Sequence, residues 1–429
     1  MKLKLKSFFN FIVLFVLIIP VMIIFSACGS DYSAKNLAVE LGYTSVEEMV
    51  EGLKGKDGEK GADGADGRDG KDAVNAYELY ETAVANGEFS GTFIEFLKEF
   101  NVVADDGNAI ASKAILSVVR INNGAKDIGT GVIYSIDKDE GNALIITNFH
   151  VVSSGNTTSK GMSFKIYLYG ESSGITATVV GAVKTYDLAV LKVSESEVIK
   201  QSHARAIDFA ESYHVGDKVY ALGNANGNGI SVTQGVISVE SEKNTMKFST
   251  TSQYKIRMLR HDAYITHGNS GGALVNTDGD LVGITNGGIE NTDMNNAYPV
   301  DLVQKVVNAI LRYCENTEST NIKVVNLGIE ESTVSTTIEE VDGVLNVVYT
   351  QKIEALSGTA ADAGVLQVGD ILKRIEIGPK VFEITKNYSL EESLLLAKVG
   401  DEIKIVTNQG GSEVVWTITL EDSNFKSII

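Results

Sequence analysis

A serine flanked by glycines has the residue types that acyl transfer requires. It lies in His267-Gly268-Asn269-Ser270-Gly271-Gly272. A turn of this composition can present a hydroxyl nucleophile while the backbone amides of Gly268, Asn269 and Ser270 form an oxyanion hole beside it. Most glycine-flanked serines lie in ordinary loops, so the motif carries weight only with a base and an orienting acid elsewhere in the chain.

Candidates for both groups lie upstream. The apolar segment before Asn148-Phe149-His150-Val151-Val152 ends at a histidine, a frequent general base. Asp187 precedes the apolar strand Leu188-Ala189-Val190-Leu191, where its carboxylate could be buried and accept the histidine N–H. The chain order is His, Asp, Ser, which is the chymotrypsin order rather than that of subtilisin or the α/β-hydrolases.

Further motifs occur in a consistent order around these three. They are Gly129-Thr130-Gly131-Val132-Ile133, Val232-Thr233-Gln234-Gly235-Val236-Ile237-Ser238, Asp262-Ala263 and Leu281-Val282-Gly283-Ile284. Together the motifs resemble the HtrA (DegP/DegS-like) trypsin-fold serine proteases that carry a PDZ domain, and the resemblance runs from about Ala109 to Leu420. It implies that His150 is the general base, that Asp187 orients it and that Ser270 attacks the peptide carbonyl.

The same resemblance bounds the specificity. Tyr264 stands six residues before Ser270, where trypsin-like enzymes place an acid at the base of the first pocket. The pocket wall would be Ile284, Thr285 and Asn286. We therefore expect cleavage after apolar residues, in unfolded or misfolded protein substrates.

The expected fold class is mainly β. Short apolar strands separated by glycine and polar turns run through residues 108–315 and are typical of barrels or sandwiches. The predicted strands are 116–121, 131–136, 143–147, 164–169, 176–183, 218–223, 230–240, 273–275 and 281–285. The family fold is a chymotrypsin/trypsin-like double β-barrel with the active site between the barrels. A helix over Asp301 to Tyr313, apolar on one face, would close this domain.

A polar linker at 316–322 precedes a predicted α+β PDZ domain over 323–422. Asn326-Leu327-Gly328-Ile329 resembles the carboxylate-binding loop of such domains, and the segment from Gly358 to Leu372 resembles their helix and Gly-Asp turn. Such a loop binds the C-termini of peptides through backbone amides while a strand edge pairs with the peptide. The alternative is an α+β end domain without this function.

The N-terminal segment 1–28 is typical of an export signal. Lysines at positions 2, 4 and 6 precede an apolar run from Phe11 to Phe25, and Ser26-Ala27-Cys28 resembles a bacterial lipobox. We expect an exported protein, lipid-anchored through Cys28 on the extracytoplasmic face of the cell membrane. An uncleaved transmembrane anchor is the alternative.

Two short helical hairpins are predicted at 29–54 and 73–107, on either side of a segment with glycine at every third position. This collagen-like Gly-X-Y segment, 55–72, contains no proline. A flexible charged spacer is the interpretation that we prefer, and a triple helix is the alternative.

The net charge of −19 argues against a nucleic-acid partner. The histidines besides His150 show no ligand spacing, so neither a metal site nor a cofactor is expected. The family usually has proline at the position of His267, and we hypothesise that this imidazole changes the geometry or the pH response of the oxyanion loop. Cys314 is expected to be a buried core residue rather than a reactive thiol.

Two classes of function remain open from the sequence. The first is an active surface endopeptidase whose PDZ domain presents substrates or shifts the protease toward its active state. The second is a catalytically inactive peptide-binding, chaperone-like lipoprotein. The family resemblance also implies assembly as a homotrimer.

Overall fold

A computed structural model describes Val84, Ser90 and residues 107–123, 127–153, 157–247, 253–288, 294–341 and 344–428. The predicted signal with Cys28, the Gly-X-Y segment and, apart from Val84, Ser90 and Gly107, both predicted helical hairpins lie outside these residues. Among the described helices, none combines the length and the apolar composition that crossing a membrane requires.

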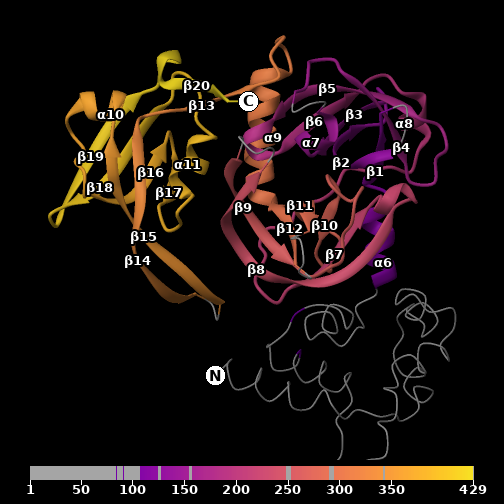
Figure 1. Ribbon diagram of the computed structural model, residues 1–429, viewed down its shortest axis with the longest axis horizontal. Coiled ribbons are helices and arrows are strands. Elements are labelled where there is room, and N and C mark those ends of the chain that lie inside the picture. The colour runs from indigo at the N-terminus through magenta and orange to yellow at the C-terminus, as the bar shows by residue number, and fades with distance from the viewer. Residues whose placement is uncertain are drawn as a thin grey trace, which may run out of the picture. The chain divides into compact units, whose positions relative to one another are not determined.

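The first closed barrel contains six strands, in the order β1-β2-β3-β6-β5-β4 (Figure 1). They are β1 (Val118–Asn122), β2 (Asp127–Asp137), β3 (Asn142–Thr147), β4 (Ser163–Leu168), β5 (Ile175–Val183) and β6 (Leu188–Val193). The interior is filled by fully buried aliphatic side chains such as Ile121, Ile145 and Leu191. Helices α6 (Gly107–Ile115), α7 (Phe149–Val152) and α8 (Glu197–Gln201) and the 3₁₀ turn η2 (Lys184–Tyr186) flank these strands in the sequence.

The second closed barrel follows the order β10-β11-β12-β9-β8-β7. Its strands are β7 (Lys218–Gly223), β8 (Ser231–Lys247), β9 (Gln253–His261), β10 (Ala273–Val275), β11 (Leu281–Gly288) and β12 (Asn295–Pro299), and the 3₁₀ turn η3 (Ala225–Gly227) follows β7. The prediction of a mainly β domain built from two barrels is therefore confirmed.

Two of these strands are absent from the sequence-based prediction. Strand β9 interleaves Lys255, Arg257 and Arg260 with apolar residues, and β12 is the short segment Asn295–Pro299. Strand β12 shows neither an apolar run nor alternation, whereas β9 alternates apolar and basic residues from Tyr254 to Met258 and was missed despite that pattern. They form because closing the barrel requires partners for β8 and β11, which β9 and β12 supply through antiparallel pairing.

Helix α9 (Val300–Cys314) confirms the predicted closing helix. Its apolar stripe of Leu302, Val303, Val306, Val307 and Ile310 is fully buried. A β-carbon added at Gly181 on β5 would lie 2.7 Å from the Ile310 side chain and 2.8 Å from that of Cys314, so glycine allows the helix to approach this strand closely.

The C-terminal residues form a sheet in the order β14-β15-β16-β18-β19, with β17 paired to β16 and a separate pair of β13 and β20. The strands are β13 (Ile322–Val325), β14 (Ile329–Val341), β15 (Val344–Leu356), β16 (Ile371–Ile377), β17 (Lys380–Glu383), β18 (Glu402–Gln409), β19 (Ser412–Thr419) and β20 (Phe425–Ile428). Two helices, α10 (Gly358–Ala363) and α11 (Ser389–Leu394), and the turn η4 (Asp422–Asn424) complete this region.

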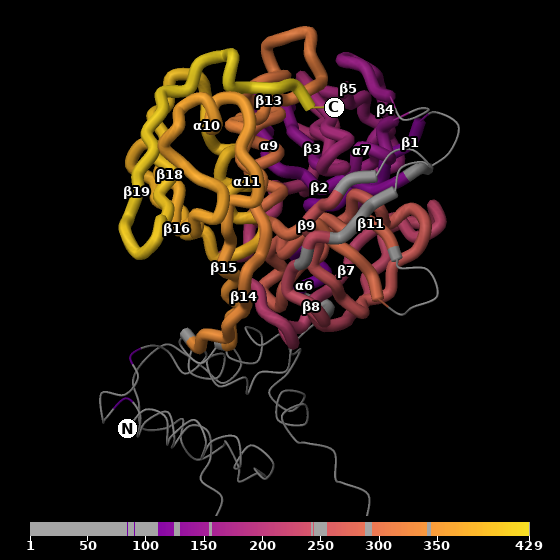
Figure 2. Tube along the Cα trace, turned by 60° about the vertical axis from the view of Figure 1, so that its left-hand side comes forward, coloured from indigo at the N-terminus to yellow at the C-terminus, as the bar shows by residue number. Residues whose placement is uncertain are grey.

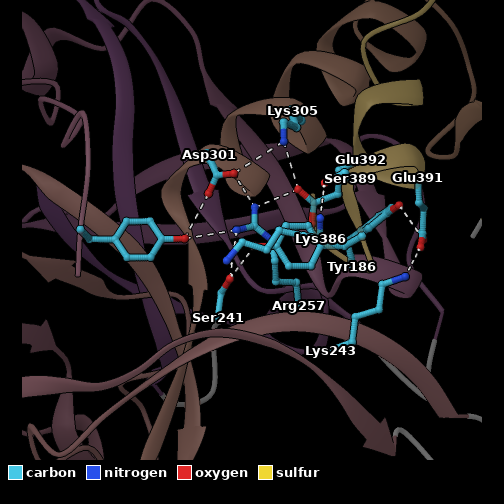
Figure 3. A network of polar contacts seen from close by, with 12 residues as sticks. Tyr186, Ser241, Lys243, Arg257, Asp301, Lys305, Lys386, Ser389, Glu391 and Glu392 are labelled. Atoms are coloured by element: carbon cyan, nitrogen blue, oxygen red, sulfur yellow. Dashed lines mark hydrogen bonds and ion pairs between the residues drawn. The ribbon is translucent and has the colours of Figure 1, made fainter. Parts of the chain in front are cut away.

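Helix α11 lies between the C-terminal sheet and the second barrel (Figure 2). The contact centres on Arg257 of β9, whose guanidinium donates to both carboxylate oxygens of Glu392 at 2.6 and 2.8 Å (Figure 3). It also donates to Asp301 of α9 at 2.5 Å and lies 4.4 Å from the centre of the Tyr388 ring. A cluster of charged groups centred on the buried Arg257–Glu392 pair thus links the C-terminal region to the barrel.

Candidate active site

His150 and Asp187 meet because their strands are neighbours. Strand β3 ends at Thr147, which pairs with Ala189 near the start of β6. His150 follows on α7, and Asp187 caps η2 in a left-handed conformation with φ of 49°. The histidine Nδ1 lies 2.8 Å from Asp187 Oδ2 and 3.1 Å from Oδ1, and the backbone amide of His150 donates to Oδ1 at 3.0 Å.

Burial and charge oppose each other at this pair. The Asp187 side chain is fully buried, whereas 39% of the His150 side chain is exposed. Partial burial lowers the pKa of His150, but the negative charge of Asp187 and the hydrogen bond to it outweigh this effect and raise the pKa above its usual 6.5. The imidazole therefore has the enhanced basicity that a proton acceptor requires.

The turn that carries Ser270 is held by hydrogen bonds to both barrels. The amide of Thr130 on β2 donates to the Ser270 carbonyl at 2.9 Å, and the amide of Gly271 donates to the carbonyl of Thr285 at 2.9 Å. Gly271 has φ of 82°, and an added β-carbon would clash with the Thr130 carbonyl and the Thr147 hydroxyl and lie 3.2 Å from the Asn148 amide. This turn therefore lies beside the segment that leads to His150.

The Ser270 hydroxyl itself donates to the backbone carbonyl of Asn286, at 2.6 Å. In the part of the chain that the structure describes, no hydrogen bond joins it to Nε2 of His150. The structure thus pairs the base with the acid and leaves the hydroxyl in a resting orientation.

Two of the three amides expected in the oxyanion hole are available. Those of Gly268 and Ser270 have no acceptor within the described residues, whereas the amide of Asn269 donates to the Thr266 carbonyl at 3.1 Å. Gly268 has φ of 93°, and its carbonyl accepts a hydrogen bond from the Thr130 hydroxyl at 2.6 Å. Asn269 instead supports the turn from within, since its carbonyl accepts the Thr285 hydroxyl at 2.7 Å.

The predicted pocket residues separate into two groups. Ile284, Thr285 and Asn286 are buried on β11 beside the serine turn, whereas Tyr264 is 67% exposed. Tyr264 is held by its carbonyl, which accepts the Thr233 hydroxyl at 2.6 Å. The predicted carboxylate-binding loop, Asn326 to Ile329, lies apart from these residues, between β13 and β14.

Sequence reasoning did not identify Tyr298. This fully buried tyrosine on β12 donates to Asp187 Oδ2 at 3.1 Å and accepts a hydrogen bond from the Asn286 side chain. Nothing in the sequence around Tyr298 indicates that its hydroxyl contacts a carboxylate 111 positions away along the chain. The pairing of β11 with β12 places it beside Ile284, and the hydroxyl contact with Asp187 joins the second barrel to the first.

Within the described residues, no hydrogen bond joins the side chains of His261, His267 or Cys314 to those of His150, Asp187 or Ser270. Burial lowers the pKa of His261 to about 4, and the carbonyl of His267 accepts the Asn226 amide at 2.6 Å. Within the described residues, no cluster of histidine, cysteine, aspartate or glutamate could hold a metal ion. Cys314 is buried as expected, and burial raises the pKa of its thiol to about 11.

Comparison with known proteins agrees with this geometry. Residues 129–284 match a family model described as a trypsin-like peptidase domain. The Serine protease Do-like HtrA of Lactobacillus helveticus is 31% identical over 306 residues, covering 68% of this chain and 68% of that protein. The protein of the same name from Bacillus subtilis (strain 168) is 33% identical over 314 residues, covering 70% of this chain and 64% of the relative.

A solved structure described as HtrA-type protease AlgW with tripeptide shares the fold. Its TM-score is 0.51 at 22% identity, covering 74% of this chain and 97% of that chain. The double barrel, the peptidase-domain match and the curated relatives agree on one assignment. The chain is therefore a serine endopeptidase and belongs to the HtrA family of trypsin-like serine proteases.

Proposed function

We propose that Ser270 is the nucleophile, His150 the general base and Asp187 the acid that orients the base. The observation that carries this assignment is the 2.8 Å contact between His150 Nδ1 and the buried Asp187 carboxylate. The amide of Thr130, from the same barrel, fixes the backbone of Ser270 at 2.9 Å. The family membership makes this convergence the expected place for the reaction.

Catalysis begins when the Ser270 hydroxyl leaves the Asn286 carbonyl and rotates toward Nε2 of His150. The hydrogen bond that is lost has a net value of about 1 kcal/mol, which is small beside an acylation barrier. Nε2 takes the hydroxyl proton as Oγ attacks the substrate carbonyl, and Asp187 stabilises the imidazolium. The imidazolium then gives the proton to the leaving amine, and water releases the acyl group by the same route.

The developing oxyanion would be held by the amides of Gly268 and Ser270. Both are unengaged among the described residues, so they need not break an existing bond when negative charge appears. We assign the amide of Asn269 to the interior of the turn, where it donates to the Thr266 carbonyl.

The substrates that we propose are unfolded or misfolded proteins, cleaved after small or medium apolar residues. The first pocket would be formed by Ile284, Thr285 and Asn286, with Tyr264 at its exposed rim. None of these four carries an acid that could bind a lysine or arginine side chain. A cleavage profile over a peptide library, with preferred cuts after basic residues, would contradict this assignment.

We propose that the C-terminal sheet is a PDZ domain that binds peptide C-termini at Asn326 to Ile329. The carbonyl of Leu327 accepts the Ala360 amide at 2.9 Å, and that of Gly328 accepts the Ser357 amide at 2.8 Å. With both carbonyls turned inward, the amides of Leu327 and Gly328 have no acceptor in the described part of the chain. Strand β14 is an end strand of its sheet and can pair with an extended peptide.

This proposal is tested by fluorescence anisotropy with one apolar peptide in two forms. The form with a free C-terminus should bind, and the C-terminally amidated form should bind much more weakly, because the loop amides recognise a carboxylate. Equal binding of both forms would contradict the assignment of the loop.

We further propose that the protein is exported, lipid-anchored through Cys28 and assembled as a homotrimer. These features are supported by the sequence motifs and the family resemblance. Metabolic labelling with palmitate, lost in Cys28→Ala, tests the anchor. Analytical ultracentrifugation of the detergent-solubilised chain tests the assembly.

The central experiment is active-site labelling of the full chain with a fluorophosphonate, with and without a peptide ligand. Labelling and hydrolysis of an unfolded protein should both disappear in Ser270→Ala. They should persist in Ser163→Ala, which changes an exposed serine on β4. Labelling that survives in Ser270→Ala would overturn the nucleophile assignment. A wild-type chain that binds peptides but is neither labelled nor hydrolytic would instead be a peptide-holding protein.

A further inference from the structure

The hydroxyl of Tyr298 lies at the carboxylate of Asp187. Tyr298 is fully buried on β12 and pairs with Ile284 of β11, two residues before Asn286. Its hydroxyl is 3.1 Å from Asp187 Oδ2, and the Asn286 side chain donates to that hydroxyl. The backbone carbonyl of the same Asn286 accepts the Ser270 hydroxyl at 2.6 Å.

The hydrogen bonds of the Asp187 carboxylate can be counted because this side chain is fully buried. His150 donates to Oδ1 from its backbone and interacts with both oxygens through Nδ1. Within the described residues, Tyr298 is the one donor to this carboxylate that does not belong to His150. A buried carboxylate that lacks hydrogen-bond donors destabilises the folded protein considerably. The Tyr298 hydroxyl therefore stabilises the charged form of Asp187.

The direction of each proton follows from the surroundings. Burial, followed by the negative charge of Asp187, raises the pKa of Tyr298 well above its usual 10, so the phenol keeps its proton. The hydroxyl therefore donates to Asp187 Oδ2 and uses a lone pair to accept from Nδ2 of Asn286. Each hydrogen bond in this series therefore points the same way: Asn286 donates to Tyr298, and Tyr298 donates to Asp187.

We propose that Tyr298 is a positioning residue of the reaction, which holds Asp187 toward His150 and ties it through Asn286 to the segment on which the Ser270 hydroxyl rests. This inference rests on the roles proposed above for His150, Asp187 and Ser270. It adds a second connection between acid and nucleophile, which runs through β12 and β11 and bypasses the imidazole.

The hydroxyl also tunes the base. A donor on Asp187 Oδ2 withdraws negative charge from the carboxylate and weakens the field that stabilises the imidazolium. Removing that donor should raise the pKa of His150, because Asp187 then interacts more strongly with the protonated ring. It should also lower turnover, because the carboxylate loses one of the bonds that fix its orientation.

The test uses Tyr298→Phe in the full chain, with Tyr220→Phe as a matched control. Tyr220 is a buried tyrosine of the same barrel, on β7. With a peptide substrate, Tyr298→Phe should lower kcat about tenfold with little change in KM, the size expected for losing one hydrogen bond to a charged group. The acid limb of kcat/KM should move up by roughly 0.5 pH unit, and Tyr220→Phe should change neither quantity.

Asn286→Ala supplies an independent variant, because it removes the side-chain donor to Tyr298 and keeps the backbone carbonyl that accepts Ser270. Because Asn286 also lines the proposed pocket, the relay is tested by the acid limb rather than by turnover: the double variant should move the acid limb no further than Tyr298→Phe alone. Additive movements of the acid limb would overturn the relay through Asn286.

Other outcomes distinguish the inference from the proposed function. An active wild-type chain in which Tyr298→Phe leaves kcat and the acid limb unchanged would overturn the inference alone. A loss of thermal stability and activity without any movement of the acid limb would also overturn it, since a merely structural role predicts that result. A wild-type chain without hydrolytic activity would overturn the proposed function and this inference together.

Discussion

Replacing Arg257 with methionine removes a buried positive charge while keeping a side chain of similar length. The Arg257 side chain is 3% exposed and that of Glu392 is 5% exposed. Arg257 holds Glu392 through two hydrogen bonds of 2.6 and 2.8 Å, and it also contacts Asp301 at 2.5 Å. The substitution would leave the Glu392 carboxylate without its main partner and with almost no access to water (Figure 3).

The expected loss in free energy of unfolding depends on which partners Glu392 keeps. Removing one partner of a buried ion pair typically costs about 3–5 kcal/mol, because the other charge is left uncompensated. Lys305 stays within 3.0 Å of Glu392 Oε2 and offsets part of this loss. We therefore expect Arg257→Met to lower the free energy of unfolding by about 2–4 kcal/mol.

The chain carries its own reporter for this measurement. Trp416 is the single tryptophan of the sequence and is buried on β19 of the C-terminal sheet. Arg257 belongs to β9 of the second barrel. Urea unfolding followed by tryptophan fluorescence, in a Ser270→Ala background that prevents self-cleavage, therefore reports on the sheet when the barrel is altered. A lower midpoint in Arg257→Met means that the two regions are energetically coupled.

Two variants make the result interpretable. Lys255→Met removes a charge from an exposed position of the same strand and should leave the midpoint unchanged. The double variant Arg257→Met with Glu392→Leu replaces the pair by apolar groups and should recover most of the loss. If the Trp416 midpoint of Arg257→Met coincides with that of Lys255→Met, the buried cluster does not hold the C-terminal region and the reasoning is refuted.

Three further predictions concern the site and its turn. Asp187→Asn should lower kcat about ten-thousandfold while the chain stays folded, because His150 loses the charge that orients it and the hydrogen bond that fixes its tautomer. Steady-state kinetics measure the loss, and circular dichroism checks the fold. A loss in kcat below about tenfold would exclude Asp187 from the reaction. Activity should fall as pH drops through a His150 pKa above 6.5, since the base must be neutral, and an acid limb well below pH 6 would contradict the raised pKa. Burial lowers the pKa of His261 to about 4, so on acidification the unfolded chain binds this proton before the folded chain does. The contribution of His261 to the free energy of unfolding is therefore complete above pH 6.5, and about 3 kcal/mol is lost as pH falls toward 4. Urea unfolding across this range should show a free energy of unfolding that falls with pH and a slope that His261→Gln flattens, and an unchanged slope would refute the prediction.

Much of the architecture could be predicted from local pattern. The strands predicted at 143–147 and 176–183 match β3 and β5 to within one residue, and the strand predicted at 131–136 lies within the longer β2. Helix α9 was predicted from its apolar stripe, which is buried in the structure. Strand β12 could not be predicted, because its pairing comes from barrel closure rather than from its own residues, whereas β9 was missed although residues 254–258 alternate.

The sequence by itself determined which side chains could do chemistry. The turn glycines around Ser270, the histidine after an apolar strand and the aspartate before another are local features, so they can be recognised without coordinates. Their order along the chain, together with the surrounding motifs that resemble the HtrA family, indicated serine-protease chemistry.

Only the tertiary structure decided how those groups are connected. The Tyr298 hydroxyl meets Asp187, the Ser270 hydroxyl rests on the Asn286 carbonyl, and Arg257 is buried against a glutamate 135 positions away. Each contact joins segments that no local periodicity relates. Their geometry depends on strand register and barrel closure, and these are set by packing of the whole domain rather than by any one stretch of residues.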